Sequence, residues 1–291
     1  MESVLVLQGR VIDSVQLQQV RQLAESHPEW SRYRLSRELC ALWNWRAPNG
    51  QLKDMAARTL LLKLAGHGHV SLPKKRRPSP NRMRHKKLRP VAHDCQPITD
   101  SLACLRPLEV AELSHCSDGL ALYEWLLHHY HYLSYASAVG LNLKYLVRDC
   151  RGRPLSCLLF ASAAWKCDAR DRFIGWNLVQ RQAHLQQITN NCRFLVLPWV
   201  QVPQLASHVL GLVLRRLRQD WQRKYACPLQ LVETFVDASR FGGTCYRAAN
   251  WIDLGQTRGR TRQDRQHQIA VPAKRVWVYP LENQFRHHLC A

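Results

Sequence analysis

One segment, residues 191–260, constrains the fold of this chain more than any other. It contains, in order, a buried strand (RFLVLPWV), a long helix (QLASHVLGLVLRRLRQDWQRKYA), a second strand (PLQLVETFVD) and a short helix around Tyr246. The long helix carries apolar residues at helical spacing on one side and arginines on the other. Two strands joined by such a helix predict a mixed α/β domain, and the order is typical of group-transfer folds.

The charge of the chain indicates a polyanionic partner. It has 42 Lys and Arg against 21 Asp and Glu, a net charge of +21. Each phosphate neutralised by such side chains releases condensed counterions, so nucleic acid, and DNA above all, is the expected partner. The alternative is a basic surface that has no partner.

The apolar runs and the cysteines of the sequence indicate the cellular location of the protein. No window approaches the ~20 apolar residues of a membrane span, so no membrane partner is expected. The 11 cysteines are an odd number, and the sequence contains no CxxC pair. Neither a disulfide framework nor a zinc ribbon is therefore expected, and the predicted location is the reducing cytoplasm.

Composition divides the chain into residues 1–73, 74–100 and 101–291. The first segment predicts three helices followed by a short strand, HVSLP, which is the order of an all-α helix-turn-helix or winged-helix-like DNA-binding domain. The exposed face of its third helix would present four polar side chains to phosphates or base edges: Lys53, Arg58, Thr59 and Lys63. The alternative is an ordinary three-helix bundle with a solvated basic face.

Residues 74–100 predict a basic linker. Lys and Arg occupy nine positions between Lys74 and Arg89, and three prolines disfavour a helix there. Such a segment can lie along a phosphate backbone without reading sequence. Its first cations, expected to contact nucleic acid, are Lys74, Lys75, Arg76 and Arg77.

Residues 101–291 predict the α/β domain. Within it, LKYLVRD and PLSCLLFASAAW predict a hairpin, whereas DARDRFIGW predicts an irregular charged loop. The histidines of HHYH have no acidic or cysteine partner at ligand spacing, so no metal site is expected.

The order of elements over roughly residues 120–260 resembles the GNAT acyltransferase fold. A tyrosine followed five residues later by an aromatic is typical of that fold, and CYRAANW supplies Tyr246 and Trp251. The resemblance implies a mixed sheet, with Tyr246 as general acid and a donor bound at a helix N-terminus. The coenzyme A loop of such enzymes reads Q/R-x-x-G-x-G/A, but here Gln204 stands at the first glycine, between Gln201 and Ala206. Its side chain would crowd a phosphate, so the cofactor is left open.

A closer resemblance is to the Druantia anti-phage protein A family, which also occurs beside transposases in mobile elements. It is carried by AAWKCDARDRFIGW, NNCRFLVLPW, LASHVL, ETFVD, RFGGTCYRAANW and GQTRGR. The family has HYLGY where this chain has HYLSY, with Ser134. The residues that the resemblance implies are Arg170, Asp171, Trp176, Asn191, Arg193, Glu233, Asp237, Tyr246, Asn250, Trp251, Thr257 and Arg260.

Several of these residues have a candidate chemical role. Tyr246 could donate a proton or attack phosphorus, or it could be an ordinary buried tyrosine with one hydrogen bond. Asp237 or Glu233 could act as base or orient a partner. The two acids are roughly 13 Å apart on one strand, too far to share a proton. The alternative is that each is buried and neutralised by an arginine, with Arg170 or Arg193 as the partner of Glu233. Otherwise these two arginines would clamp phosphate or substrate.

Asn250 and Trp251 could hold an unpaired base by hydrogen bonding and stacking, or they could be ordinary core and cap residues. The sequence therefore predicts a DNA-binding protein of anti-phage defence or of a mobile element, with a group-transfer activity on nucleic acid. One alternative is a non-catalytic DNA-binding accessory that acts with other defence or transposition proteins. Another is an enzyme that cleaves DNA strands.

Overall fold

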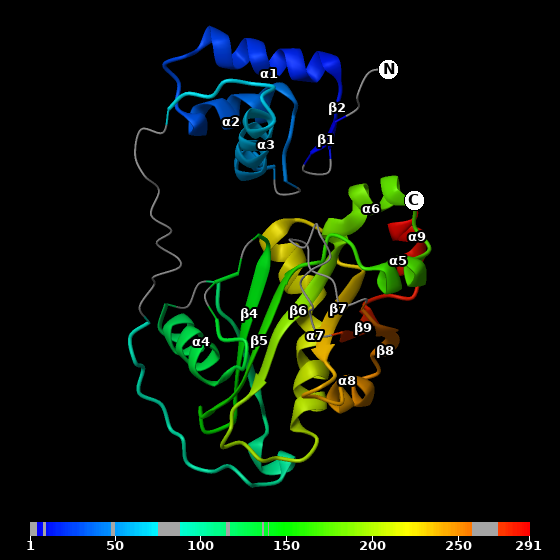
Figure 1. Ribbon diagram of the computed structural model, residues 1–291. Coiled ribbons are helices and arrows are strands. Elements are labelled where there is room, and N and C mark those ends of the chain that lie inside the picture. The colour runs from blue at the N-terminus through cyan, green and yellow to red at the C-terminus, as the bar shows by residue number, and fades with distance from the viewer. Residues whose placement is uncertain are drawn as a thin grey trace. The chain divides into compact units, whose positions relative to one another are not determined.

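The computed structural model describes residues 5–7, 10–47, 50–74, 88–114, 117–135, 137–138, 140–257 and 273–291. The chain forms two compact units, Met1–Asn81 and Arg82–Ala291 (Figure 1). The boundary between them falls within the segment 74–100. No helix in the described segments has both the length and the apolar character that crossing a membrane requires.

The first unit packs three helices and a two-stranded hairpin around a small apolar core. These elements are β1 (Leu5–Leu7), β2 (Arg10–Ile12), α1 (Ser14–Ser26), α2 (Arg32–Leu42) and α3 (Asp54–Gly66). The side chains of Asp13 and Ser31 cap α1 and α2 by accepting backbone N–H groups three residues on. The core is built from apolar residues at helical spacing, among them Leu35, Leu39, Leu60 and Leu64.

The three expected helices are present, but the strand expected at HVSLP is not. Residues 70–74 form no regular element, and the described hairpin of this unit precedes the helices instead of following them. Arginine side chains bind the backbone of this segment, and no described strand pairs with it. Arg21 Nε donates to His69 O and Arg32 Nε to Pro73 O, both at 2.7 Å. The winged-helix order is therefore not confirmed.

The second unit is a mixed α/β structure, as predicted. Its sheet has the order β3-β4-β5-β6-β7-β9-β8. The strands are β3 (Glu109–Glu112), β4 (Asn142–Arg148), β5 (Pro154–Ser162), β6 (Ile188–Val196), β7 (Leu231–Asp237), β8 (Ile252–Gln256) and β9 (Lys274–Pro280). Neighbouring strands are antiparallel except β6 and β7, which are parallel. A parallel pair needs a crossover, and α7 (Leu205–Tyr225) supplies it.

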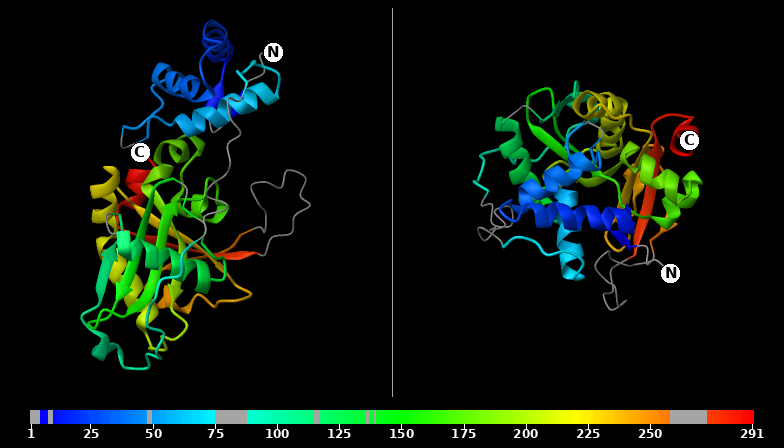
Figure 2. Two further views of the ribbon diagram at one scale, coloured as in Figure 1. Left: turned by 90° about the vertical axis from the view of Figure 1, so that its left-hand side faces the viewer. Right: turned by 90° about the horizontal axis from the view of Figure 1, so that it is seen from above.

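Helices α4 (Ser117–Tyr130) and α7 cover opposite faces of the sheet (Figures 1 and 2). The burial of almost every residue of β5 agrees with this, because a strand covered on both faces has no solvent side. On the α7 side, the Tyr145 hydroxyl donates to Asp220 at 2.9 Å. On the α4 side, the Tyr123 hydroxyl donates to Leu158 O at 2.9 Å.

Three short helices also belong to the second unit, and the first and the last of them contribute to a smaller apolar cluster beside β8 and β9 that includes Ile174, Trp176 and Phe285. They are α5 (Asp168–Ile174), α6 (Leu178–His184) and α9 (Phe285–Leu289), and α8 (Thr244–Ala248) lies between β7 and β8. The expectation of an irregular loop at DARDRFIGW is wrong, because most of it is α5. Two short 3-10 turns, Leu102–Leu105 and Leu185–Gln187, complete the described elements.

The C-terminal part of the segment expected to be a linker packs on the second unit. Ile98 is buried and forms an isolated parallel bridge with Val200. The His93 ring stacks on Trp199 with ring centroids 5.5 Å apart. Residues 75–87, which hold most of the cations of this segment, lie outside the described residues.

Candidate functional site

The parallel strands β6 and β7 separate part-way along their length. Their pairing ends at Asn190 opposite Glu233, whereas β6 continues to Val196 and β7 to Asp237. We call the region between residues 191–196 and 234–237 the β6–β7 fork. At its base the Thr234 hydroxyl donates to Asn191 O at 2.9 Å. Strand ends that diverge in this way are where α/β sheets often place their ligand sites.

Tyr246 lies at the fork and is buried. Its hydroxyl donates to Asn191 Oδ1 at 2.8 Å, which joins two of the predicted site residues. Burial raises the pKa of Tyr246 well above its usual value, so the phenol stays protonated at neutral pH. The phenol carries a proton that a substrate could accept, although the raised pKa makes it a weaker acid than an ordinary tyrosine, and it is not ionised for nucleophilic attack.

Gly243 allows the short helix α8 to approach the core closely. Its φ is 71°, in the left-handed region, and a Cβ there would lie 2.9 Å from Trp277 Cζ2. No other residue type provides both the conformation and the space. Gly243 therefore determines how Tyr246 enters the fork.

Trp251 packs against Tyr246, with ring centroids 5.0 Å apart, and is only 4% exposed. A base cannot stack on a ring whose faces are covered, so this residue does not provide the stacking surface considered from the sequence. Asn250 is exposed and has a φ of 61°, which fits the left-handed turn that ends α8. Thr257 joins the base of the β8–β9 hairpin by hydrogen bonds to Lys274, and Arg260 lies outside the described residues.

Glu233 and Arg170 form a fully buried ion pair. Arg170 donates to Glu233 Oε2 at 2.8 Å, and both side chains are 0% exposed. The Ala164 N–H donates to the other carboxylate oxygen of Glu233 at 2.6 Å. Burial opposes the charge of Arg170, but Glu233 and Asp171 raise its pKa above the usual value. Of the two alternatives for Glu233, the structure shows the neutralised acid, with Arg170 and not Arg193 as its partner.

Asp171 extends this ion pair toward the surface. Its Oδ1 accepts from Arg170 at 2.7 Å and from the Trp176 indole N–H at 3.1 Å, and its Oδ2 accepts from Arg181 at 3.1 Å. These three donors occupy both carboxylate oxygens. The arrangement places Asp171 as a fixed anchor for two arginines and a tryptophan, and leaves it poorly suited to act as a base.

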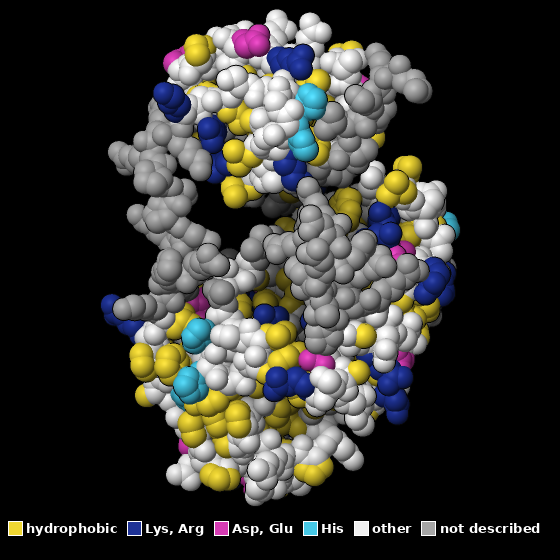
Figure 3. Space-filling model, in the orientation of Figure 1, with side chains coloured by type: hydrophobic (Ala, Val, Ile, Leu, Met, Phe, Trp, Pro, Cys, Tyr) yellow, Lys and Arg dark blue, Asp and Glu magenta, His cyan; other side chains and the backbone are white. Residues whose placement is uncertain are grey.

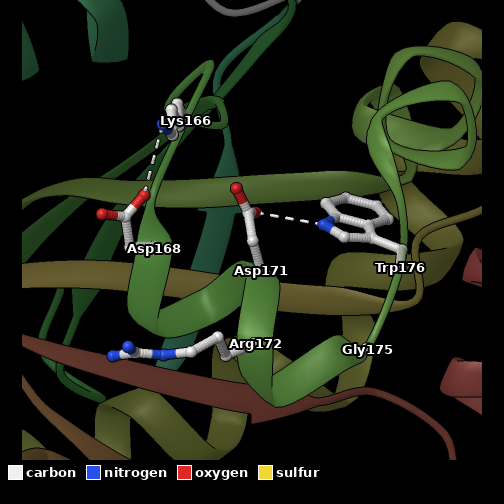
Figure 4. Close-up of a pocket in the computed structure, with 6 residues that line it drawn as sticks. All are labelled: Lys166, Asp168, Asp171, Arg172, Gly175 and Trp176. Atoms are coloured by element: carbon white, nitrogen blue, oxygen red, sulfur yellow. Dashed lines mark hydrogen bonds and ion pairs between the residues drawn. The ribbon is translucent and has the colours of Figure 1, made fainter.

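An open pocket of about 590 Å³ lies beside Asp171 (Figure 4). Its wall combines opposite charges, and Lys166 and Asp168 are paired across 3.6 Å. Figure 4 shows the Asp171 carboxylate turned toward Trp176, whereas Arg172 extends away from it. The predicted residues Asp171 and Trp176 thus share one pocket, separate from the predicted group around Tyr246.

Asp237 shapes the turn that follows β7. Its carboxylate accepts from the Ser239 hydroxyl at 2.6 Å and from the Ser239 N–H at 3.1 Å. The hydrogen bond from the Ser239 hydroxyl is the main cause of the lowered pKa of Asp237. The backbone carbonyl of Asp237 accepts from the N–H groups of Arg240 and Phe241. A carboxylate held in this way positions the turn and is a weak proton acceptor.

Arg193 ties the loop after α4 to β6. Its Nε donates to Ser134 O at 3.0 Å, so it does not pair with Glu233. Ser134, which replaces a glycine of the similar family, has a φ of 50°. Its hydroxyl donates to His128 O at 3.0 Å at the end of α4. This bond helps a non-glycine residue hold a left-handed conformation.

The sequence did not single out an exposed group of side chains beside the fork. Tyr132 and Phe241 are 36% and 49% exposed, and their ring centroids lie 5.3 Å apart. The guanidinium of Arg240 lies 4.7 Å from the Tyr132 ring centroid. We call these three residues the Tyr132–Phe241 cluster. The aromatic-rich HYHYLSY and the RFGG turn were the only signals, and nothing in the sequence shows that the two meet.

The N-terminus of α7 combines a glycine-like backbone with a larger side chain. Gln204 has a φ of 63° and precedes the helix without a capping hydrogen bond from its side chain. This is the conformation that the glycine of the coenzyme A loop would favour. The side chain of Gln204 is exposed at this position, where the loop pattern has none.

The predicted DNA-binding face of α3 is only partly basic. Arg58 pairs with Asp54 at 4.0 Å and lies 5.4 Å from the Tyr33 ring centroid of α2. The exposed surface of the helix includes Met55 and Leu62, which are 65% and 45% exposed. A recognition helix that reads base edges would normally expose polar side chains instead.

The remaining predicted residues of the first unit differ in exposure. Thr59 is exposed, and its hydroxyl donates to Met55 O at 3.0 Å. Lys53 and Lys63 are half-buried, and Lys74 is exposed at the end of a described range. The predicted linker residues Lys75, Arg76 and Arg77 lie outside the described residues. Among the described residues, no group of three or more His, Cys, Asp or Glu side chains could hold a metal ion.

Comparison with solved structures finds spermidine N-acetyltransferases at low similarity. The enzyme from Vibrio cholerae in complex with CoA and spermine is 8% identical, with a TM-score of 0.40, and the match covers 60% of this chain and 95% of that one. A chimera of the Vibrio cholerae enzyme and hSSAT is 9% identical, with a TM-score of 0.39 and coverage of 60% and 95%. These values are too low to transfer any function. No curated protein matches the chain.

Among the described residues, the sheet order, the parallel pair β6–β7 bridged by α7 and the short helix carrying Tyr246 define a mixed α/β protein. A protein-family model also matches residues 63–276, more than half of the chain. The chain belongs to the family of the Druantia protein DruA.

Proposed function

We propose that this chain binds DNA as part of anti-phage defence, and that the second unit supplies much of the contact surface. The observation that carries the proposal is a set of exposed arginines that form no ion pair with the described residues. They are Arg106, Arg151, Arg172, Arg215, Arg240 and Arg247. Side chains of this kind are available to neutralise phosphates.

The acidic side chains of the second unit are largely engaged with other arginines. Asp220, for example, is buried and accepts from Arg216 and Arg223, and Asp149 accepts from Arg153 at 2.7 Å. The excess of positive charge therefore falls on exposed side chains. Lys and Arg side chains recur over the face drawn in Figure 3.

The test is the salt dependence of DNA binding by the full chain, measured by fluorescence anisotropy with single- and double-stranded oligonucleotides. The logarithm of the binding constant should fall with the logarithm of salt concentration by about 0.9 per neutralised phosphate on the duplex and by about 0.7 on the single strand. Arg215→Gln should reduce this slope, whereas Arg218→Gln should reduce it less. The two residues lie on α7 and their replacement changes the charge equally, but Arg218 pairs with Glu282 at 2.5 Å. The proposal fails if no oligonucleotide binds with measurable salt dependence.

A second candidate function is group transfer at the β6–β7 fork. It is favoured by the protonated hydroxyl of Tyr246, which lies where two strands diverge next to the N-terminal end of a short helix. Its test is incubation of the chain with DNA, with and without magnesium and acyl donors, followed by mass spectrometry and gel analysis. Tyr246→Phe should abolish any mass shift. Nicks or covalent adducts would instead indicate strand cleavage, and unmodified DNA throughout would favour a non-catalytic accessory of a defence or transposition complex.

A further inference from the structure

The Tyr132–Phe241 cluster is an exposed aromatic surface whose rings have no role in the function proposed above. Three other aromatic side chains near the fork are buried: Tyr246, Trp251 and Trp277. The cluster instead exposes about a third of Tyr132 and half of Phe241, with Leu133 beside them at 45%. Exposed aromatics that gather beside an arginine mark an interaction surface more often than isolated apolar residues do.

The loop that carries Tyr132 is held in place by hydrogen bonds on both sides of it. The Leu133 N–H donates to His131 Nδ1 at 3.1 Å, and the Ser134 N–H donates to His131 O at 2.7 Å. Arg193 then fixes Ser134 to β6. Tyr132 is therefore presented by a fixed loop, which reduces the entropy lost when a ligand stacks on its ring.

The turn that carries Arg240 and Phe241 is fixed independently. The carbonyl of Asp237 accepts from both of their N–H groups, at 3.1 and 2.9 Å, and its carboxylate binds Ser239. Two separately anchored segments thus bring one arginine and two aromatic rings together. A surface that is rigid before it binds is what a stacking site requires.

The chemistry of the cluster fits an unpaired nucleotide. Every base has a π-face that can stack on an aromatic ring, and an arginine beside the ring can bind the adjoining phosphate or stack on the base. Arg240 forms no ion pair with the described residues. The Asp237 carboxylate and the Arg193 guanidinium both lie near enough to affect Tyr132, so two arginines and one acid surround this ring. A partner protein that docked an apolar side chain here would bury the Arg240 guanidinium without a compensating negative charge, unless the partner also supplied an acidic side chain.

We propose that Tyr132, Phe241 and Arg240 form a stacking site for an unpaired base of single-stranded DNA, at the edge of the β6–β7 fork. The inference rests on the proposed DNA binding and adds to it a strand preference and the residues that create it. Aromatic stacking explains a preference for exposed bases because a base inside a duplex has both of its faces covered.

The experiment uses the full chain and an oligothymidine carrying one 2-aminopurine, with a duplex of equal length as the second ligand. Tyr132→Ala and Phe241→Ala should each weaken single-strand binding by about tenfold and leave duplex binding within about twofold. Both should also remove the quenching of 2-aminopurine fluorescence that stacking causes. Tyr132→Phe should keep both properties, because it retains the ring. Trp165→Ala is the matched control, since Trp165 is 43% exposed and lies 6.0 Å from the Arg181 guanidinium, outside the cluster.

Each outcome bears on a different proposal. If the wild type binds neither ligand, the proposed function fails and this inference fails with it. If the wild type binds and both alanine variants match it in affinity and quenching, DNA binding stands and the stacking site is refuted. Equal losses on single strands and duplex would also refute stacking, and so would an equal loss in Trp165→Ala. Circular dichroism of each variant checks that its fold is retained.

Discussion

Replacing Glu233 by alanine should destabilise the second unit severely, because Arg170 cannot reach water. The change removes the 2.8 Å ion pair and leaves a guanidinium that is 0% exposed with less compensation. It also removes the acceptor of the Ala164 N–H, which donates at 2.6 Å. Arg170 keeps Asp171 as a partner at 2.7 Å, so its charge is not wholly uncompensated.

The magnitude follows from these contacts. Breaking a buried ion pair by removing one partner costs about 3–5 kcal/mol, and the remaining Asp171 places this case near the lower end. The unsatisfied Ala164 N–H adds about 1 kcal/mol. We therefore expect a loss of about 4 kcal/mol, a large part of the roughly 5–15 kcal/mol that stabilises a typical domain.

Two matched variants separate charge from volume. Glu233→Gln removes the charge at nearly constant volume and keeps one acceptor oxygen, for either the Ala164 N–H or Arg170, while its NH2 group faces the other donor. It should cost less than Glu233→Ala because it leaves no cavity and loses only one acceptor. The double variant Arg170→Met with Glu233→Leu removes both charges, and should be more stable than Glu233→Ala because no buried cation remains unpaired. Its remaining cost reflects the loss of the hydrogen bonds that Arg170 makes to Asp171 and Ala164 O.

The assay is urea unfolding of the full chain, with hydrogen exchange of peptides from β7 used to assign the transition to the second unit. A lower midpoint with an unchanged slope would report a loss of stability alone. If Glu233→Ala lay within about 1 kcal/mol of the wild type, Arg170 would not depend on Glu233. The reasoning from buried charge would then be wrong.

Three further predictions concern single side chains. The pKa of His131 is lowered to about 4 by burial and by Arg193, so the folded state holds it neutral. Stability should therefore fall by up to roughly 3 kcal/mol as the pH drops from about 6.5 to 4, and His131→Asn should remove that part of the acid sensitivity in urea unfolding at several pH values. Gly243→Ala should lower stability by about 2 kcal/mol because of its φ of 71° and the 2.9 Å approach to Trp277; an unchanged melting temperature would contradict this. Tyr246→Phe should cost about 1 kcal/mol because Asn191 Oδ1 loses its donor. In a double-mutant cycle, the variant that carries both Tyr246→Phe and Asn191→Ala should lose less stability than the two single variants lose together.

Local patterns were sufficient for many elements but failed where the pattern was short or ambiguous. The long amphipathic stretch is α7, and the apolar runs on either side of it are β6 and β7. DARDRFIGW looked like a loop because its residues are charged, yet α5 forms there around Arg170, whose charge is satisfied by distant Glu233. HVSLP looked like a strand, but its backbone carbonyls accept hydrogen bonds from arginine side chains and not from a partner strand.

The candidate site shows the same division. The resemblance to the Druantia protein family pointed to Tyr246, Asn191, Arg170 and Glu233, and the structure joins them as two bonded pairs. The sequence left open whether Arg170 or Arg193 would pair with Glu233, since either choice satisfies a buried acid. It likewise left open whether Trp251 would stack on a base or lie in the core, and the structure shows the core residue.

The sequence by itself determined the class of fold, the family and the excess of positive charge, because periodicity, motifs and composition are properties of neighbouring residues. Only the tertiary structure decided which arginine neutralises Glu233, which aromatics remain exposed, and that Tyr132 meets Phe241. These outcomes depend on contacts between segments that are far apart in the chain. The energy that selects such contacts comes from burial and charge compensation in three dimensions, and no local pattern contains that information.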